Sequence, residues 1–211
     1  MHYKIITIEG NIGSGKTSLA KKLAQQYNTH LVLETFADNP FLQKFFEKQQ
    51  DYALGMEMFF MAERYEQFNN EIEIHLQEDR PIIIDYLFTK SLIFANANLD
   101  TTEFNLFKKI FDILNPKLPS PDLIIYLHSE PKRLIENIKF RGREFEQTVQ
   151  LEYLKKIEDA YFEGFNNLKG AVKLIVDVTH ADFVENANQY NRISALVENF
   201  YPIGLHHILI D

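Results

Sequence analysis

Short runs of aliphatic and β-branched residues recur along the chain, and longer stretches with helical periodicity separate them. Such runs, without polar alternation, are typical of strands that are buried on both faces of a parallel sheet. The alternation of these strands with helices predicts a doubly wound α/β fold with helices on both faces of the sheet. The five predicted parallel strands are residues 3–8, 30–33, 81–85, 122–128 and 171–177.

A long amphipathic pattern between the second and third strands predicts a helix from about Tyr52 to Gln77. Its apolar residues recur every three or four positions, which is the spacing of one helix face. The face expected to be buried carries Leu54, Met58, Met61, Tyr65, Phe68, Ile72 and Leu76. Near the end of the chain, residues 202–210 are also apolar, and they could pack either on their own chain or on a partner.

Composition is that of an ordinary globular protein. The 211 residues, of which 45% are hydrophobic and 25% charged, suit a single domain with a full core. No apolar run reaches the roughly 20 residues of a membrane span, and the first strand begins too early for a signal peptide. The absence of cysteine excludes disulfides and thiolate metal sites. We therefore expect one domain over residues 1–211, in the cytoplasm and away from membranes.

The net charge of −8 argues against nonspecific binding of nucleic acid, which needs a cationic surface. One local exception is a basic cluster that follows the fourth predicted strand. The seven histidines do not show the spacing of a zinc site. The basic cluster comprises Lys132, Arg133, Lys139, Arg141 and Arg143.

A glycine-rich loop of the form G-x-x-x-x-G-K-T follows the first predicted strand and opens a helical pattern. That order of elements is the context that a phosphate loop requires, whereas a chance glycine-rich turn would not need it. Backbone N–H groups and the helix dipole can hold phosphate oxygens, Lys16 can reach the β- and γ-phosphates, and Thr17 can ligate Mg²⁺. The predicted site for ATP comprises Gly10, Asn11, Ile12, Gly13, Ser14, Gly15, Lys16, Thr17 and Ser18.

Two carboxylates end the second and third predicted strands, at the edge of the sheet where the loop also lies. Glu34 is a candidate base for the proton of an attacking hydroxyl, and a surface glutamate is the alternative. Asp85 is a candidate ligand of Mg²⁺, directly or through water, and a helix N-cap is the alternative. Together they favour phosphoryl transfer over nucleotide binding alone.

Two pairs of charged residues could complete such a site. Arg141 and Arg143 flank a glycine, so they could close over a triphosphate and neutralise developing charge, or form a solvated turn. Glu57 and Arg64 are seven residues apart on the long helix and therefore share a face. They could form a surface ion pair or, because apolar residues flank Glu57, read the edge of a nucleobase.

Taken together, these features resemble the deoxyribonucleoside kinases of the non-thymidine-kinase-1 type, most closely the bacterial deoxyguanosine and deoxyadenosine kinases. The likeness covers nearly the whole chain, and the ordered set of motifs is far more specific than the phosphate loop alone. The matching segments are 8–17, Glu34 with 38–42, 56–65, Asp85 with Tyr86, 93–95, 141–143 with Glu146, and 151–154.

The resemblance implies a three-layer P-loop kinase fold with a short arginine-rich lid at about residues 137–147, and a homodimer joined through helices. It implies that the γ-phosphate of ATP, with Mg²⁺, is transferred to the 5′-hydroxyl of a deoxynucleoside. In this resemblance Glu34 acts as the general base, Lys16, Thr17 and Asp85 contact phosphate and metal, and Arg141 and Arg143 are the cations of the lid. Glu146 binds the 3′-hydroxyl of the sugar, and Glu57 and Arg64 contact the nucleobase.

The chain departs from the family pattern at several positions. An arginine is usual where this chain has Tyr86, so its role near the 5′-oxygen is either vacant or filled by Lys90. Phe46 stands where relatives carry a tyrosine that bonds the sugar. Asn137 stands where many lids have a further arginine, and Lys139 could replace that charge.

Glu57 replaces a more usual glutamine, and this change bears on the choice of base. A glutamine side chain offers a donor and an acceptor, whereas a carboxylate only accepts. It therefore suits guanine N1–H or adenine N6–H₂, with Arg64 donating to O6 or N7. Thymine N3–H is a further option, but the carbonyls that flank it would face the second carboxylate oxygen. Since an unmatched buried polar pair costs several powers of ten in specificity, we expect a purine deoxynucleoside.

Two other functions compete with this interpretation. A nucleoside monophosphate kinase of the thymidylate-kinase type shares the fold and the loop, but it needs cations for the acceptor's own phosphate, and Tyr86 speaks against one. A nucleotide-dependent switch with little phosphotransfer would not need Glu34, Asp85 and two lid arginines together.

Overall fold

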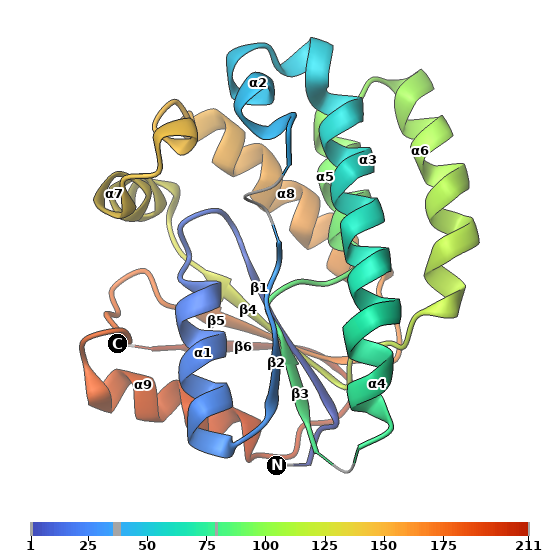
Figure 1. The fold of residues 1–211 in the computed structure, drawn as a ribbon. Helices are drawn as coiled ribbons and strands as arrows, with labels where there is room; N and C mark the ends of the chain where they lie inside the picture. Colours follow the sequence, from blue (N-terminus) through green and yellow to red (C-terminus); the bar gives the residue numbers. More distant parts are fainter. Residues whose placement is uncertain (1, 36–38, 79, 211) are drawn as a thin grey trace.

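A six-stranded parallel sheet forms the centre of the molecule, and helices pack on both of its faces (Figure 1). The computed structural model describes residues 2–35, 39–78 and 80–210, so Asp38, which belongs to one matching segment, lies outside the described residues. The strand order is β2-β3-β1-β4-β5-β6. The strands are β1 (Ile5–Gly10), β2 (His30–Val32), β3 (Ile82–Ile84), β4 (Leu123–His128), β5 (Val172–Asp177) and β6 (Gly204–Leu209).

The prediction of five strands was wrong, because β6 adds a sixth at the edge beside β5. Its residues alternate between partly buried and exposed, and they include two histidines and a glycine. An edge strand of this kind lacks the unbroken apolar run that identifies the central strands. The backbone of the apolar C-terminal segment therefore pairs within its own chain, while Ile203, Leu205 and Leu209 keep exposed side chains.

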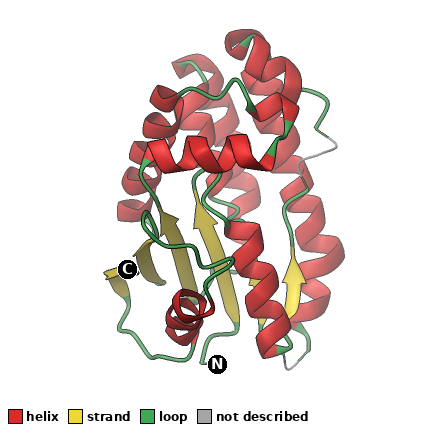
Figure 2. Cartoon of the chain, turned by 90° about the vertical axis from the view of Figure 1, so that its left-hand side faces the viewer, coloured by secondary structure: helices red, strands yellow, loops and turns green. Residues whose placement is uncertain are grey.

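The helices form one layer on each face of the sheet, and all strands run between these layers (Figures 1 and 2). One face is covered by α1 and α9, whose residues Leu19, Leu23 and Ile193 pack on Ile6 and Ile8. The other face is covered by α5 and α8, with α3 and α6 further out. The helices are α1 (Lys16–Tyr27), α2 (Leu42–Glu47), α3 (Gln49–Gln67), α4 (Glu73–Leu76), α5 (Lys90–Asn98), α6 (Thr101–Leu114), α7 (Pro131–Arg141), α8 (Leu151–Asn167) and α9 (Ala187–Ser194).

The predicted helix at 52–77 is present as α3 and α4, joined by a π-helical segment at Phe68–Ile72. The predicted buried face was only partly right, since Met61 and Ile72 alone among its seven residues are fully buried. The helix is turned so that two charged residues lie on its buried face. The buried residues of α3 are Ala53, Met56, Glu57, Met61 and Arg64.

Parallel strands direct their carboxyl ends to one edge, where the loops after β1, β2 and β3 meet. The phosphate loop, Glu34 and Asp85 are therefore brought together by the sheet itself. Within the described ranges, the chain has no helix with the length and apolar character needed to cross a membrane.

Candidate active site

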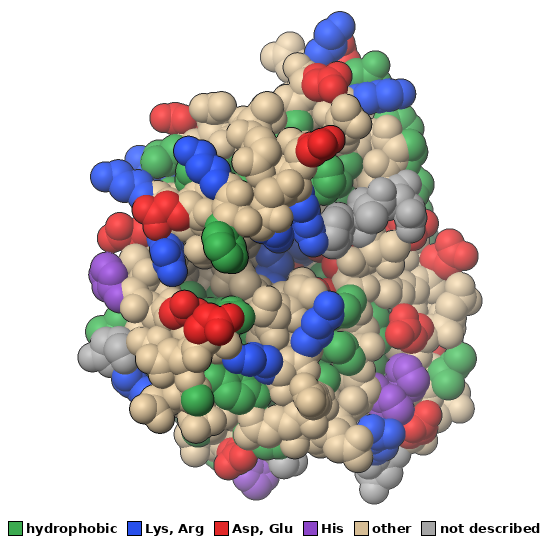
Figure 3. All heavy atoms as spheres, turned by 60° about the vertical axis from the view of Figure 1, so that its left-hand side comes forward, with side chains coloured by type: hydrophobic (Ala, Val, Ile, Leu, Met, Phe, Trp, Pro, Cys, Tyr) green, Lys and Arg blue, Asp and Glu red, His purple; other side chains and the backbone are tan. Residues whose placement is uncertain are grey.

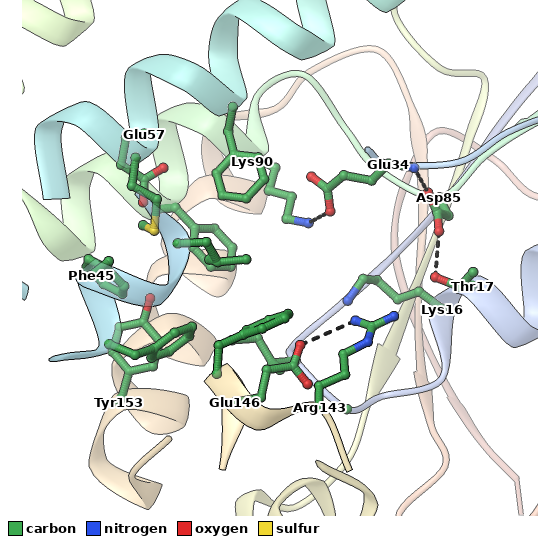
Figure 4. A pocket seen from close by; sticks show the side chains of 18 of the residues that line it. Lys16, Thr17, Glu34, Phe45, Glu57, Asp85, Lys90, Arg143, Glu146 and Tyr153 are labelled. Atoms are coloured by element: carbon green, nitrogen blue, oxygen red, sulfur yellow. Dashed lines mark hydrogen bonds and ion pairs between the residues drawn. The ribbon is translucent and has the colours of Figure 1, made fainter. Parts of the chain in front are cut away.

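A cavity opens at the carboxyl edge of the sheet, and side chains from all layers of the fold line it (Figure 4). The phosphate loop and Asp85 lie at one end of the cavity, while Glu57 and Tyr153 lie at the other. Seen from outside, basic side chains gather around a hollow in this face of the molecule (Figure 3). The cavity thus joins a cationic end to a largely aromatic end.

The phosphate loop connects β1 to α1 and depends on glycine at two close approaches. Gly13 and Gly15 have left-handed φ angles of 82° and 88°. A Cβ at Gly13 would lie 2.8 Å from the backbone oxygen of Leu134, and one at Gly15 would lie 2.7 Å from the ring of Phe183. Other residues are therefore excluded on both conformational and steric grounds. The amino end of α1 begins directly behind this loop, at Lys16.

Lys16 folds back over the loop, where its Nζ donates to the backbone oxygen of Asn11 at 3.0 Å. Burial, together with the nearby Lys90 ammonium, lowers the pKa of Lys16 to about 8. The negative charge of a bound phosphate would favour the charged form of Lys16 and so raise its pKa again.

Glu9, which the sequence did not single out, ties the loop to the opposite helix layer. Its carboxylate is fully buried and accepts from the N–H of Leu87 at 2.7 Å and from the hydroxyl of Tyr161 at 2.8 Å. Burial raises the pKa of Glu9. Because it precedes Gly10 on β1, it anchors the start of the loop to α8.

Asp85 links the loop to the end of β2. Thr17 Oγ1 donates to its Oδ2 at 2.6 Å, and the backbone N–H of Glu34 donates to its Oδ1 at 2.5 Å. The N-cap alternative for Asp85 is wrong, because the next helix begins only at Lys90. The hydroxyl of Thr17 and the carboxylate of Asp85 are oxygen ligands of the type that Mg²⁺ prefers, so these residues fit the predicted metal.

Glu34 is held between two cations from the opposite helix layer. Lys90 Nζ donates to Oε2 at 2.6 Å, and Arg64 donates to Oε1 through Nε at 2.9 Å and through Nη2. Burial alone would raise the pKa of Glu34, but Lys90 and Arg64 outweigh it and lower the pKa to about 2. The side chain is 14% exposed, so the surface alternative for Glu34 is wrong.

Glu57 and Arg64 do not form the surface pair that was the alternative, since both are buried and both line the cavity. Each is bonded across to α5 instead. Arg64 Nη1 donates to Ser91 Oγ at 2.7 Å, and Asn98 Nδ2 donates to Glu57 Oε1 at 2.7 Å. Two polar pairs, two helical turns apart, therefore join α3 to α5.

Glu57 itself is 1% exposed, and burial raises its pKa to about 7. The hydrogen bond from Asn98 and the charges of Arg64 and Lys90 act against that rise, while Glu34 adds to it. A carboxyl with such a pKa changes its protonation state near neutral pH, which is typical of functional sites.

Aromatic rings form the walls between the two ends of the cavity. Phe45, Phe60, Phe94 and Tyr153 line it. The guanidinium of Arg64 lies 5.2 Å from the ring centroid of Phe60, and Lys90 Nζ lies 5.5 Å from that of Phe94. These rings hold the two cations beside Glu34 and leave apolar faces that suit a planar base.

The arginines at the end of α7 are bonded to Glu146 from the short helical turn Glu144–Glu146. Arg141 Nη2 donates to one oxygen of Glu146, and Arg143 Nη1 donates to the other at 3.3 Å. Both arginines line the cavity, with 36% of the Arg141 side chain and 33% of the Arg143 side chain exposed. Gly142 between them has a left-handed φ of 72°, which ends the helix.

Two further positions at which the chain departs from the family pattern also contact the site. Asn137 Nδ2 donates to the backbone oxygen of Gly13 at 2.9 Å, so it fastens α7 to the phosphate loop. Phe46 lines the cavity and stacks on Phe145, with centroids 6.4 Å apart. In this arrangement Phe46 lies next to Glu146 without offering a hydroxyl.

Sequence reasoning missed Ser91, Asn98 and Tyr153, and it named Lys90 only as one option. A usable signal was present, because Ser91 and Asn98 are seven residues apart in a helical segment where Asn96 is the only polar residue between them. That spacing equals the spacing of Glu57 and Arg64. Two buried helices with matching polar positions are expected to pair them.

Three side chains converge at the opposite edge of the sheet. His30 Nε2 lies 2.7 Å and His75 Nδ1 3.7 Å from the carboxylate of Glu78. The spacing of the histidines did not predict this cluster, because His30 begins β2 and the other two lie near the end of α4. Their imidazole rings are stacked with centroids 3.8 Å apart, so their lone pairs lie in two nearly parallel, separated planes and do not meet at one ion at the bond length of about 2.0–2.1 Å that zinc needs.

Comparisons with known proteins agree with this geometry. The deoxynucleoside kinase family matches residues 6–202 of the chain. The deoxyguanosine kinase of Bacillus subtilis strain 168 is 36% identical over 197 residues, covering 92% of this chain and 95% of that protein. The deoxyadenosine kinase of Lactobacillus acidophilus is 30% identical over 213 residues, covering 95% of this chain and 98% of that protein.

The same fold occurs among solved structures. The structure of deoxyadenosine kinase from M. mycoides with bound dATP matches with a TM-score of 0.80 and 22% identity, covering 93% of this chain and 100% of that one. A second structure of that enzyme, with products dCMP and a flexible dCDP bound, has a TM-score of 0.79 and 23% identity. The three-layer arrangement predicted from the sequence is therefore confirmed.

Proposed function

Because this chain belongs to the deoxynucleoside kinase family, we propose that it phosphorylates a purine 2′-deoxyribonucleoside, either deoxyadenosine or deoxyguanosine. The γ-phosphate of ATP moves to the 5′-hydroxyl, which yields the 5′-monophosphate for nucleotide salvage. The observation that carries the purine assignment is Glu57, a buried carboxylate at the aromatic end of the cavity. The cavity's cationic end supports the binding of the transferred phosphate.

The donor binds at the phosphate loop in this proposal. Residues 10–18 hold the phosphates through backbone N–H groups and the amino end of α1, and Lys16 contacts the γ-phosphate. Thr17 and Asp85 hold Mg²⁺, which neutralises charge on the transferred group. Arg141 and Arg143 add positive charge as the lid closes.

The acceptor lies between Glu34 and Glu57. Glu34 orients the 5′-hydroxyl and takes its proton as the new O–P bond forms. Glu146 accepts from the 3′-hydroxyl beside the ring of Phe46. The base lies between the aromatic walls with its N–H groups toward Glu57, while Arg64 supports both ends because it contacts Glu34 and lies near Glu57.

Lys90 takes the role of the arginine that Tyr86 replaces. Its ammonium is buried and lies 2.6 Å from Glu34, so it can hold the carboxylate and approach the 5′-oxygen. We expect Lys90→Met to lower kcat by about 10- to 100-fold, because a buried carboxylate loses one of its cations. Lys90→Arg should keep most of the activity. Steady-state kinetics with Lys108→Met as an exposed control would check this, and full activity of Lys90→Met would mean that Arg64 suffices.

A substrate panel tests the proposal against its main rival. Mg-ATP is supplied with deoxyadenosine, deoxyguanosine, deoxycytidine, thymidine and the corresponding monophosphates, and the products are measured. We expect the two purine deoxynucleosides to be the best acceptors. Preference for a monophosphate would instead establish a monophosphate kinase, and preference for a pyrimidine would reject the role given to Glu57.

The family also supports two expectations about the state of the protein. We propose that it forms a homodimer through its helices and acts in the cytoplasm. Sedimentation of the purified protein over a range of concentrations would test the dimer, and a monomer throughout would reject it.

A further inference from the structure

The polar contacts around Glu57 come from three helices that meet at the aromatic end of the cavity. Glu57 lies on α3, Asn98 is the last residue of α5, and Tyr153 lies in the first turn of α8. Asn98 Nδ2 donates to Glu57 Oε1 at 2.7 Å and to the hydroxyl oxygen of Tyr153 at 3.2 Å. Glu57 and Tyr153 line the cavity (Figure 4), and Asn98 bonds to both of them without being a lining residue itself.

The orientation of the Asn98 amide follows from the chemistry of its partners. Its two N–H groups match two acceptors, a carboxylate oxygen and a phenol oxygen. If the amide were reversed, its carbonyl oxygen would face the Glu57 carboxylate at hydrogen-bond distance, and the two acceptors would repel each other. The NH₂ group is therefore committed to Glu57 and Tyr153, and the Glu57 Oε1 that it contacts is fixed.

We propose that Asn98 is a positioning residue for base selection, which favours the ionised form of the Glu57 carboxylate and turns Oε2 toward the N–H groups of a purine. This inference rests on the proposed function, because it assumes that Glu57 contacts the base. Without Asn98, Glu57 would lose its neutral donor in an apolar setting and would take up a proton more readily. A protonated carboxyl has one donor and one acceptor, like the amide of glutamine.

Protonation of Glu57 is governed by groups from every element packed around it. Arg64 lies on the same helix, Lys90 comes from α5, Glu34 follows β2, and Tyr153 comes from α8. Burial raises the pKa of Glu57 to about 7, and the hydrogen bond from Asn98 is the largest influence in the opposite direction. The charged neighbours stay in place when Asn98 alone is changed, so the effect of Asn98 can be isolated.

The test is the pH dependence of base selectivity, measured as the ratio of kcat/KM for deoxyguanosine to that for deoxycytidine between about pH 6 and pH 8.5. In the parent enzyme this ratio should rise with pH as Glu57 ionises. In Asn98→Ala the midpoint should move upward by about one pH unit, and the ratio at neutral pH should fall by about 10-fold. Asn96→Ala, at an exposed position on the same helix, is the matched control and should leave the midpoint unchanged.

Two further variants make the result decisive. Asn98→Asp keeps the shape of the side chain but places a second carboxyl beside Glu57, so it should shift the midpoint further than Asn98→Ala does. In a Glu57→Gln background the pH dependence should be absent, and Asn98→Ala should not restore it. Thermal melting of each variant would verify that it folds.

The possible outcomes separate this inference from the proposed function. If Asn98→Ala lowers kcat/KM equally for both nucleosides and leaves the midpoint in place, Asn98 is only structural and the inference is overturned. If Glu57→Gln itself leaves the selectivity and its pH dependence unchanged, the base-reading role of Glu57 fails, whatever Asn98 does. If the parent enzyme phosphorylated no nucleoside at all, the proposed function as a whole would be rejected.

Discussion

Glu34→Gln should lower kcat by more than about 100-fold, which is the usual scale for the loss of a catalytic base. The amide keeps the shape of the side chain, but its single oxygen can accept from only one of Lys90 and Arg64, and it cannot take the proton of the 5′-hydroxyl. We expect KM for the nucleoside to change much less than kcat, because the base and sugar contacts remain. Steady-state kinetics with Mg-ATP and the preferred purine deoxynucleoside would measure both values.

Glu66→Gln, at an exposed position on α3, is a matched control for this substitution and should behave like the parent enzyme. Turnover within a few-fold of the parent in Glu34→Gln would remove Glu34 from the proton transfer. If the variant bound neither substrate, its site would have collapsed. Calorimetric measurement of nucleoside binding would detect this.

The low pKa of Glu34 constrains how it can act. With a pKa of about 2 in the empty site, the carboxylate is ionised throughout the physiological range and is a weak acceptor of protons. Phosphoryl transfer passes through a loose transition state in which the attacking oxygen carries little negative charge until late. Glu34 is therefore suited to orient the hydroxyl first and to receive its proton only as the new bond forms.

Glu57→Gln should broaden base use, with the selectivity for purine over deoxycytidine falling by about 100-fold. The parent carboxylate can only accept, so cytosine would bring its N3 acceptor against a buried anion. The glutamine amide adds a donor and removes the charge, which satisfies that edge. Values of kcat/KM for the four deoxynucleosides at about pH 8, where the parent side chain is ionised, would measure the change.

The same exposed substitution, Glu66→Gln, controls for the loss of one negative charge from α3. Because the change is confined to one end of the cavity, kcat for the preferred purine should fall far less than it does in Glu34→Gln. An unaltered substrate profile would place Glu57 outside the contact with the base and would leave the purine preference without its physical reason.

The parts of the site that could be predicted are those that the sheet positions by itself. Residues 10–18, Glu34 and Asp85 each follow a parallel strand, so their common location follows from the direction of the strands. Even there the sequence did not reveal Glu9, because it lies just before the motif and the motif assigns no role to that position. The family resemblance then assigned roles to residues such as Glu57 and Arg141, for which spacing alone could not decide between a surface role and a role in the site.

The contacts between helices could not be predicted in the same way. Whether Arg64 bonds to Glu57 or to Glu34 depends on how α3 is rotated against α5 and on which side chains α5 offers. The apolar periodicity gave only part of the buried face of α3, since the buried charges of Glu57 and Arg64 are stabilised by partners distant in sequence. The edge strand β6 was missed for a related reason. It forms because it pairs with β5, and its own hydrophobic pattern does not identify it as a strand.

Glu57 also limits how stable the empty enzyme can be. Since burial raises the pKa of Glu57 from 4.5 to about 7, its contribution to folding is fully present below the lower value and is lost as pH rises through the upper one. Above that range, ionisation lowers the free energy of unfolding by on the order of 3 kcal/mol, a large part of the roughly 5–15 kcal/mol typical of a domain. A nucleoside whose N–H groups meet the carboxylate offsets this loss, so the substrate is also a folding ligand, and its effect on stability is most needed at the pH values where Glu57 is ionised.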